Sequence, residues 1–533
     1  MQVGAMDQVL APAAGGRVFD LARRLTFAGV ELVVGCDELA SRDRLEQLRE
    51  EKAASGLDVP SLVLGEHSDR GGIADADPVV AERARSDVER AIGWAAELEA
   101  GAILVPFFGR AELRDEADLD RAASAFRTLC TPAGDAGVVL CYEGTLPAEA
   151  IHALADRVAS RAFGCYFDLA NVVARGMDTA TEIRSLGSLI RRVHFKDVRV
   201  TVGDCPPGLG WVDFAETTRA LDEIGYAGWI VLETPPGPRE LVARDLSFAR
   251  SVLPRLPQPE WPRLGIFTYD FGRGEWGRVI DTCRRLGLAS LQLGGPLLEE
   301  CLEKPDGIDS VVELLEDAGI SIAALAGYKN LVAPDAAARR ANLDFLERCL
   351  ELAPQFGTSV VATGTGTRSP DGDWTDSPEN VQPETRELLE ASLAELVRAA
   401  ERVGAILALE AHVKTVLRSQ VQLLGLLERF PTPHLQVVLD PYNYVSRHLL
   451  PAQERITRDF LERFEHRFVL AHLKDVDPGG ADVATIEFGT GSFSQNAYLV
   501  FLATRRPDLP LILEHLPLEH VPAAIGRMRA SHT

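Results

Sequence analysis

Two short segments of the chain place the same polar side chains after an apolar run. Residues 191–197 read RRVHFKD and residues 469–475 read VLAHLKD, so each has a histidine, a lysine two positions later and then an aspartate. Only six of the 55 basic residues are lysines, which makes two in this context hard to attribute to chance. Side chains two positions apart on a strand share a face. We therefore expect the histidine and lysine of each segment to project into one site.

The two segments belong to longer series of strand ends. In each half of the chain, four consecutive predicted strands end in an ionisable residue, in the order Glu, Asp, His, Glu, with offsets between halves of 267, 272, 278 and 281 positions. One acid at a strand end is usually a helix cap or an arginine partner, but that does not explain the repeated order. The two series are Glu143, Asp168, His194 and Glu233, and Glu410, Asp440, His472 and Glu514.

Both series have the composition of a metal site. If the strands are parallel and form a closed barrel, their carboxyl ends meet at one face and each series converges. Three converging carboxylates repel one another unless a cation lies between them. Oxygen donors with one imidazole suit a hard or borderline ion. We expect one divalent metal per series, with Mn²⁺ as the first choice and Mg²⁺, Co²⁺ or Zn²⁺ as alternatives.

The surrounding sequence predicts the elements that would position these residues. Short β-prone runs such as AILVPFF alternate with amphipathic stretches such as RSDVERAIGWAAELEAG, a pattern typical of βα units and a parallel sheet. An open doubly wound sheet also alternates, but about eight strands per half favour a closed barrel. The sequence therefore predicts an α/β protein of two tandem (β/α)₈ TIM barrels.

Length and proline content predict where the barrels divide. At 533 residues the chain exceeds the size at which single cores stop growing. Residues 253–262 contain four prolines and are predicted to form a stiff linker between domains at 1–252 and 263–533. Residues 366–380 have no apolar period, and we expect a long loop there that covers the mouth of the second barrel as a lid.

Charge and composition exclude several classes of partner. A net charge of −24 without a clustered basic face argues against nucleic acid and acidic membranes. No apolar run reaches the length of a membrane span, and no export signal is evident. Eight scattered cysteines without a C-x-x-C pair suit packing residues in a reducing cytoplasm. We expect a cytoplasmic enzyme; the sequence allows a homo-oligomer without requiring one.

Both halves resemble the xylose isomerase-like TIM barrels, a group that includes sugar-phosphate isomerases and epimerases, ketose 3-epimerases, inosose dehydratase and endonuclease IV. The resemblance is carried by FDLANVVARGMD, IRRVHFKD and GWIVLET in the first half, and by LEAH, LDPYN, HLKD and LILEH in the second. It implies that each series binds one metal and that its two glutamates also act as acid and base. The nucleases have a histidine three positions after the aspartate, where this chain has Asn171 and Asn443, so DNA repair is not expected.

Weaker candidates line the same strand ends. Each lysine of the H-x-K-D segments is expected either to bind substrate oxygens or to pair with the following aspartate. Both asparagines are candidates for a substrate hydroxyl, with helix capping as the alternative. The candidate substrate-binding residues are Lys196, Asn171, Lys474, Asn443 and His412.

These features predict a metal-dependent isomerase or epimerase of a small sugar, sugar phosphate or polyol. A glutamate would remove the proton between a ketone and its neighbouring hydroxyl, and the metal would stabilise the enediolate. A dehydratase or lyase acting on a keto-inositol or a 3-keto-glycoside uses the same intermediate and is one alternative. The other is that one barrel is catalytic and its companion has a binding or structural role.

Overall fold

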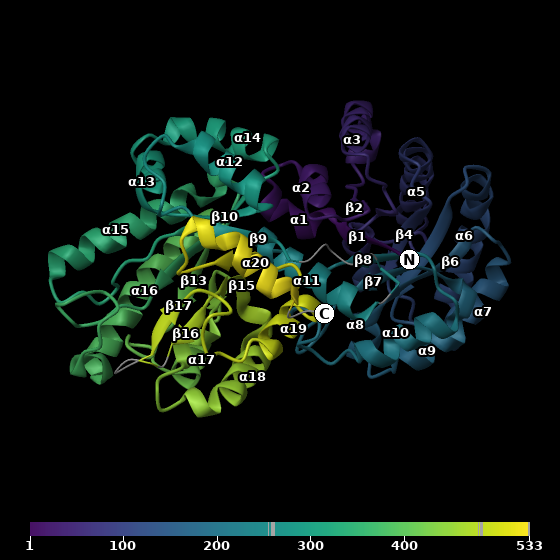
Figure 1. The fold of residues 1–533 in the computed structure, drawn as a ribbon. Coiled ribbons are helices and arrows are strands. Elements are labelled where there is room, and N and C mark those ends of the chain that lie inside the picture. Colours follow the sequence, from purple (N-terminus) through teal and green to yellow (C-terminus); the bar gives the residue numbers. More distant parts are fainter. Residues whose placement is uncertain (254, 257–261, 478, 480–482, 531–533) are drawn as a thin grey trace. The chain divides into compact units, whose positions relative to one another are not determined.

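The computed structural model describes residues 1–253, 255–256, 262–477, 479 and 483–530 (Figure 1). Its two main sheets are closed barrels of eight parallel strands each, and the chain divides into two compact units that contain one barrel apiece. The prediction of two tandem (β/α)₈ barrels is therefore confirmed. Most of the predicted linker at 253–262 lies outside the described residues, so the domain boundaries stay a prediction.

The first barrel runs in chain order around its ring and closes where Gln2 of the first strand pairs with Trp229 of the eighth. The strands are β1 (Gln2–Met6), β2 (Gly29–Val33), β3 (Leu62–Val63), β4 (Ala102–Phe107), β5 (Val139–Gly144), β6 (Phe163–Asp168), β7 (Ile190–Phe195) and β8 (Trp229–Leu232). The helices between β1 and β8 are α1 (Asp7–Ala14), α2 (Val18–Arg24), α3 (Arg42–Ser55), α4 (His67–Arg70), α5 (Pro78–Leu98), α6 (Glu116–Asp135), α7 (Ala148–Val158), α8 (Leu169–Ala174), α9 (Thr179–Leu186) and α10 (Phe214–Glu223), and α11 (Arg239–Val252) follows β8.

The second barrel repeats this plan and closes between its last and first strands, where Leu511 pairs with Leu264. The strands are β9 (Leu264–Phe267), β10 (Ser290–Leu293), β11 (Ser321–Ala326), β12 (Val360–Gly364), β13 (Ile406–Glu410), β14 (Leu435–Leu439), β15 (Phe468–Leu473) and β18 (Leu511–Leu513). The helices are α12 (Trp276–Leu286), α13 (Gly295–Glu303), α14 (Ile308–Asp317), α15 (Ala336–Leu352), α16 (Pro383–Val403), α17 (Gln420–Arg429), α18 (Gln453–Phe464), α19 (Asn496–Thr504) and α20 (Val521–Ala530). A small antiparallel pair, β16 (Asp475–Asp477) and β17 (Ala484–Ile486), follows β15.

Local chemistry explains these elements. All six residues of β4 are buried, as expected for a strand covered on both faces. Asp115 and Asp178 accept a backbone N–H at the starts of α6 and α9, which stabilises each helix. Along β12, Val360 and Ala362 join one apolar cluster and Val361 another, because one face of a barrel strand lines the interior and the other meets the helices.

Two further sequence expectations can be compared with the structure. All eight cysteines are buried and unpaired, consistent with packing residues. Among the described residues, no helix combines the length and apolarity that a bilayer crossing requires.

Candidate active site

The four ionisable residues predicted for the first barrel lie together at the ends of neighbouring strands. Glu143 and Asp168 lie at the ends of β5 and β6, His194 lies in β7, and Glu233 directly follows β8. One donor atom from each residue lies within 4.8 Å of the others. The barrel thus brings together side chains that span 90 positions of sequence, as parallel strands in a closed ring require.

One ring nitrogen of His194 faces this cluster, and the other ring nitrogen faces away from it. Its Nδ1 lies 2.8 Å from Glu233 Oε2, 3.2 Å from Glu143 Oε1 and 3.8 Å from Asp168 Oδ2. Its Nε2 lies 2.7 Å from Oε2 of Glu31, which is fully buried in β2. A proton donated from Nε2 to Glu31 leaves Nδ1 as the nitrogen available to a cation.

The second barrel repeats this arrangement with one looser member. Donor atoms of Glu410, Asp440 and His472 lie within 4.8 Å of one another. His472 Nδ1 lies 3.2 Å from Asp440, 3.5 Å from Glu410 and 3.7 Å from Glu514. Its Nε2 lies 2.9 Å from Oε1 of Gln292 on β10. Nδ1 again faces the carboxylates and Nε2 faces the second strand of the barrel.

Both lysines of the H-x-K-D segments lie inside these clusters. Lys196 Nζ is 2.8 Å from both Asp168 and Glu233, and Lys474 Nζ is 2.7 Å from both Asp440 and Glu514. Among the described residues, neither lysine pairs with the aspartate that follows it, so that alternative from the sequence is wrong. The lysines instead contact the candidate metal ligands.

The following aspartate has a structural role. Asp197 accepts the backbone N–H groups of Val198, Gly208, Gly210 and Val212. A Cβ on Gly210 would lie 2.2 Å from the Asp197 carboxylate, so a glycine is required there. Asp475 holds the matching loop of the second barrel, with N–H groups from Val476, Gly489, Gly491 and Phe493. Residues 208–210 and 489–491, which both read Gly-x-Gly, therefore each form a tight loop whose backbone N–H groups donate to a buried carboxylate.

Burial and neighbouring charges separate the pKa values of the two glutamates in the first barrel. Burial raises the pKa of Glu143 to about 7, although His194 opposes the shift. Burial alone would also raise the pKa of Glu233, but His194 and Lys196 hold it at about 2. Burial would lower the pKa of His194, but the charges of Glu233 and Glu31 raise it well above its usual value.

The second barrel shows the same directions. Burial raises the pKa of Glu410 to about 7. The pKa of Glu514 is lowered by Lys474 and His472 against the effect of burial. In both barrels, therefore, the glutamate of the fifth strand holds a proton more readily than the glutamate of the eighth.

The residues of both clusters fit a divalent cation. In the second cluster, the buried Asp440 Oδ1 has no hydrogen bond from any described residue. In the first cluster, Asp168 Oδ2 and Glu233 Oε2 share the single ammonium of Lys196. When ionised, Glu31 and the three carboxylates of the first cluster carry four negative charges. Lys196 and a protonated His194 supply only two positive charges against them. Uncompensated buried negative charge of this kind favours a bound cation.

Several side chains that contact the two series were not predicted from the sequence. Glu31 accepts hydrogen bonds from Ser61 and Tyr166 in addition to its contact with His194. In the second barrel, Tyr328 donates to Glu410 at 2.6 Å, and Gln292 donates to Tyr328 at 3.3 Å. The sequence did contain a signal for Glu31 and Gln292, since each is a polar residue inside an apolar strand, GVELVV or ASLQLGG. A strand pattern does not show which side chain such a residue contacts.

The weaker candidates have different positions in the two barrels. Asn443 is buried and its amide donates to Glu410 Oε1 at 2.6 Å. Asn171 lies in α8, and its backbone N–H is capped by Asp168. The ring of His412 packs edge-on against Trp374, with centroids 5.7 Å apart.

The predicted lid loop reaches the second cluster through Trp374. The Trp374 ring lies 6.1 Å from the ring of Tyr328, which donates to Glu410. The loop is held by Asn330, whose amide donates to Thr367 O and to Asp373. Its end forms a short 3₁₀ helix, Pro378–Val381, which the sequence pattern did not predict. Opening and closing of this loop stays a prediction.

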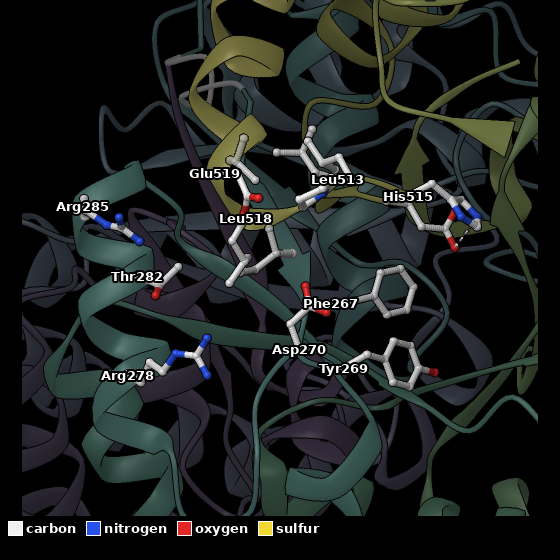
Figure 2. A pocket seen from close by; sticks show the side chains of 15 residues that line it. Phe267, Tyr269, Asp270, Arg278, Thr282, Arg285, Leu513, His515, Leu518 and Glu519 are labelled. Atoms are coloured by element: carbon white, nitrogen blue, oxygen red, sulfur yellow. Dashed lines mark ion pairs between the residues drawn. The ribbon is translucent and has the colours of Figure 1, made fainter. Parts of the chain in front are cut away.

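A cavity of about 800 Å³ adjoins Glu514 in the second barrel. Figure 2 shows Phe267, Tyr269 and Asp270 at the end of β9, with Arg278 on the neighbouring helix α12. The Phe267 ring stacks on Tyr269 at 5.3 Å and lies 5.4 Å from the ring of His472. The cavity is therefore lined by one member of the second series, Glu514, together with aromatic and charged groups.

The chain belongs to the xylose isomerase-like TIM barrel family, whose model matches residues 19–252 and again residues 276–530. The two matches correspond to the two barrels, so the resemblance noted in the sequence is confirmed for both.

Two curated relatives of the chain are named as an epimerase and a dehydratase. An Escherichia coli (strain K12) protein, provisionally named L-ribulose-5-phosphate 3-epimerase, is 28% identical over 193 residues, or 34% of this chain and 67% of that protein. The inosose dehydratase of Geobacillus thermodenitrificans (strain NG80-2) is 26% identical over 161 residues, or 26% of this chain and 54% of that protein.

Two solved structures were compared with the chain, and each covers just under half of it. The D-psicose 3-epimerase of Clostridium cellulolyticum H10 has 17% identity and a TM-score of 0.42, covering 48% of this chain and 99% of that one. The 3-keto-D-glucoside 4-epimerase of E. coli has 19% identity and a TM-score of 0.41, covering 47% and 99%.

Proposed function

We propose that the chain is a divalent-metal-dependent isomerase or epimerase of a small sugar, sugar phosphate or polyol. The observation that carries this proposal is the convergence of the same Glu, Asp, His and Glu series at the strand ends of two barrels in one chain. The relatives named as an epimerase and a dehydratase support it, since both names denote enzymes of small polyhydroxy compounds.

One metal would be held in each barrel. In the first, the ligands would be Glu143, Asp168, His194 through Nδ1, and Glu233; in the second, they would be Glu410, Asp440, His472 through Nδ1, and Glu514. When bound there, a divalent cation polarises a ketone and its neighbouring hydroxyl and stabilises the enediolate derived from them. Mn²⁺ is the first choice for this set of oxygen donors and one imidazole, with Mg²⁺, Co²⁺ and Zn²⁺ as alternatives.

The chain's own groups then move the proton. One glutamate of a pair takes the proton from the carbon between the ketone and the hydroxyl, and the other returns a proton to the opposite face of that carbon. Return to the same carbon gives an epimer, and return to the former carbonyl carbon gives an isomer. Lys196 or Lys474, within 2.8 Å of two carboxylates, can reorient toward a substrate oxygen once a cation offsets those charges.

Solvent exchange tests the proposal. The metal-loaded chain is incubated in D₂O with ketoses, ketose phosphates and keto-polyols, and the products are followed by NMR and mass spectrometry. We expect one deuterium at the carbon next to the carbonyl, and no exchange after exhaustive chelation until Mn²⁺ is restored. Full activity without any divalent metal would overturn the proposal.

A dehydratase activity is the second candidate, and the match to an inosose dehydratase favours it. The same enediolate would expel a β-hydroxyl group as water. The two candidates separate in the same experiment, because a dehydratase product lacks one water, whereas an epimer or isomer differs in composition from its substrate only by the exchanged hydrogen.

A further inference from the structure

A cluster of three different ligand types lies in the first barrel, outside the series described above. We propose that Cys36, His67 and Asp87 bind a zinc ion that acts as a structural clasp. One donor atom from each residue lies within 4.8 Å of the others. The three residues come from separate elements: Cys36 follows β2, His67 begins α4 after β3, and Asp87 lies within α5. A shared ion would tie two strand ends to the helix that covers them.

The side chain of His67 is the second observation that points to a ligand. It is 1% exposed, and no described residue gives either of its ring nitrogens a hydrogen bond. Its Nε2 meets only a long contact with the Asp87 carboxylate, and a buried imidazole held this loosely is costly, so such groups usually mark a bound ion or water.

The separation of His67 and Asp87 suits an ion between them. His67 Nε2 lies 3.5 Å from Asp87 Oδ2, which is long for a hydrogen bond. Donor atoms around a tetrahedral zinc ion lie roughly 3.3–3.8 Å apart, given zinc–ligand bonds of about 2.0–2.3 Å. The other Asp87 oxygen accepts from Arg90, which holds the carboxylate in this orientation.

The donor types select the metal. A thiolate with an imidazole and a carboxylate suits zinc, whereas Mn²⁺ and Mg²⁺ prefer oxygen donors. Glu66 is a candidate for a fourth ligand, because its Oε2 accepts the Cys36 N–H at 3.2 Å, although the same oxygen also lies 3.1 Å from Arg70 Nε. Gly35 leaves room for that carboxylate, since a Cβ there would lie 3.3 Å from Glu66 Oε1.

Burial makes the clasp structural rather than catalytic. Cys36 is 4% exposed and Asp87 is 3% exposed, so a substrate has no access to the thiol. Structural zinc sites are closed in this way, whereas catalytic sites keep an open position. In the second barrel, the segment after the third strand, β11, has Lys329 in place of a histidine, and its Nζ lies 4.5 Å from the centroid of the Phe345 ring. We therefore expect one clasp per chain.

Cobalt substitution tests the clasp independently of the proposed enzyme sites, because only a cysteine ligand produces a thiolate-to-cobalt absorption band and the two series contain no sulfur. The full chain is stripped with a chelator, titrated with Co²⁺ and then with Zn²⁺. We expect one thiolate band that zinc abolishes, and its complete loss in Cys36→Ser.

Two comparisons serve as controls. Cys301→Ser changes a cysteine of matched burial (5% exposed) in α13 of the second barrel and should keep the band. Asp168→Asn, which weakens the proposed metal site of the same barrel, should also keep it. If Cys36→Ser does not fold, Asp87→Asn retains the thiol and should weaken Co²⁺ binding at least tenfold. Absence of the band in the unmodified chain, its survival in Cys36→Ser, or unchanged affinity in Asp87→Asn would overturn the proposal.

Discussion

The two barrels differ in the residue that contacts Nε2 of the histidine in each series. Both place a polar side chain at the same point of their second strand: Glu31 pairs in register with Met6, and Gln292 with Phe267. His194 meets a carboxylate at 2.7 Å, whereas His472 meets an amide oxygen at 2.9 Å. The residues expected to bind metal are thus of the same types, while the groups that orient the histidine differ by one negative charge.

This difference indicates how two copies of one site can diverge. A carboxylate that accepts a proton from a ligating imidazole makes that imidazole a stronger donor. The first barrel is therefore expected to bind its metal more tightly. In the second barrel, the neutral Gln292 and Tyr328 would leave more of a bound cation's charge to act on a substrate.

The largest expected effect is a loss of kcat in variants that test whether both barrels are catalytic or one only binds. Glu233→Gln and Glu514→Gln each remove one acid–base group and one metal ligand while keeping the side-chain size. We expect either change to lower kcat of its own barrel on the order of 10²–10⁴-fold. The measurement is deuterium exchange with each single variant and with the double variant.

Glu216→Gln, on α10, is the control and should retain activity. If one single variant removes all activity and the other has no effect, only one barrel is catalytic. If the double variant stays active, neither glutamate acts in the reaction.

Exchanging the groups behind the histidines addresses the comparison directly. Glu31→Gln should weaken metal binding in the first barrel by roughly 10–100-fold, the usual cost of losing such a partner. Gln292→Glu should strengthen binding in the second barrel. Each change is measured by calorimetric Mn²⁺ titration in a chain whose other site is disabled, by Asp440→Asn or Asp168→Asn respectively. Equal affinities before and after both exchanges would contradict the assigned roles.

Metal binding should weaken as the pH falls. The pKa of Glu143 and that of Glu410 are raised to about 7, and those of both histidines are also raised, so the metal-free sites hold protons that a cation must displace. Affinity is therefore expected to drop between about pH 8 and pH 6, by about tenfold per unit for each proton displaced. Titration in buffers of different ionisation enthalpy counts the protons released. A pH-independent affinity would show that the sites are already deprotonated.

The smallest effect concerns the phenol of the second barrel. Tyr328→Phe removes the donor to Glu410, so we expect a loss of about 1–3 kcal/mol in the stability of the metal-free chain. The loss should shrink in the presence of metal, because the cation then neutralises the carboxylate. Denaturant unfolding with and without Mn²⁺ measures both values, and Tyr444→Phe, a buried phenol without a hydrogen bond to any described residue, is the matched control.

Much of the architecture could be predicted because barrel strands are continuous apolar runs separated by amphipathic helices. The series from Glu143 to Glu233 could be found for a related reason: parallel strands in a ring bring their ends together whatever the sequence between them. The partners of Lys196 could not be predicted, because an ammonium on a flexible side chain reaches several carboxylates and only the folded barrel determines which are within 3 Å.

The sequence by itself determined the repeat, the strand ends and the residue types of each series, since these follow from local periodicity and from order along the chain. Only the tertiary structure decided that Glu31 faces His194, that Asp197 holds a loop rather than a lysine, and that Cys36 meets His67 and Asp87. These contacts join strands and helices that are distant in sequence, and such contacts form only when the barrel closes.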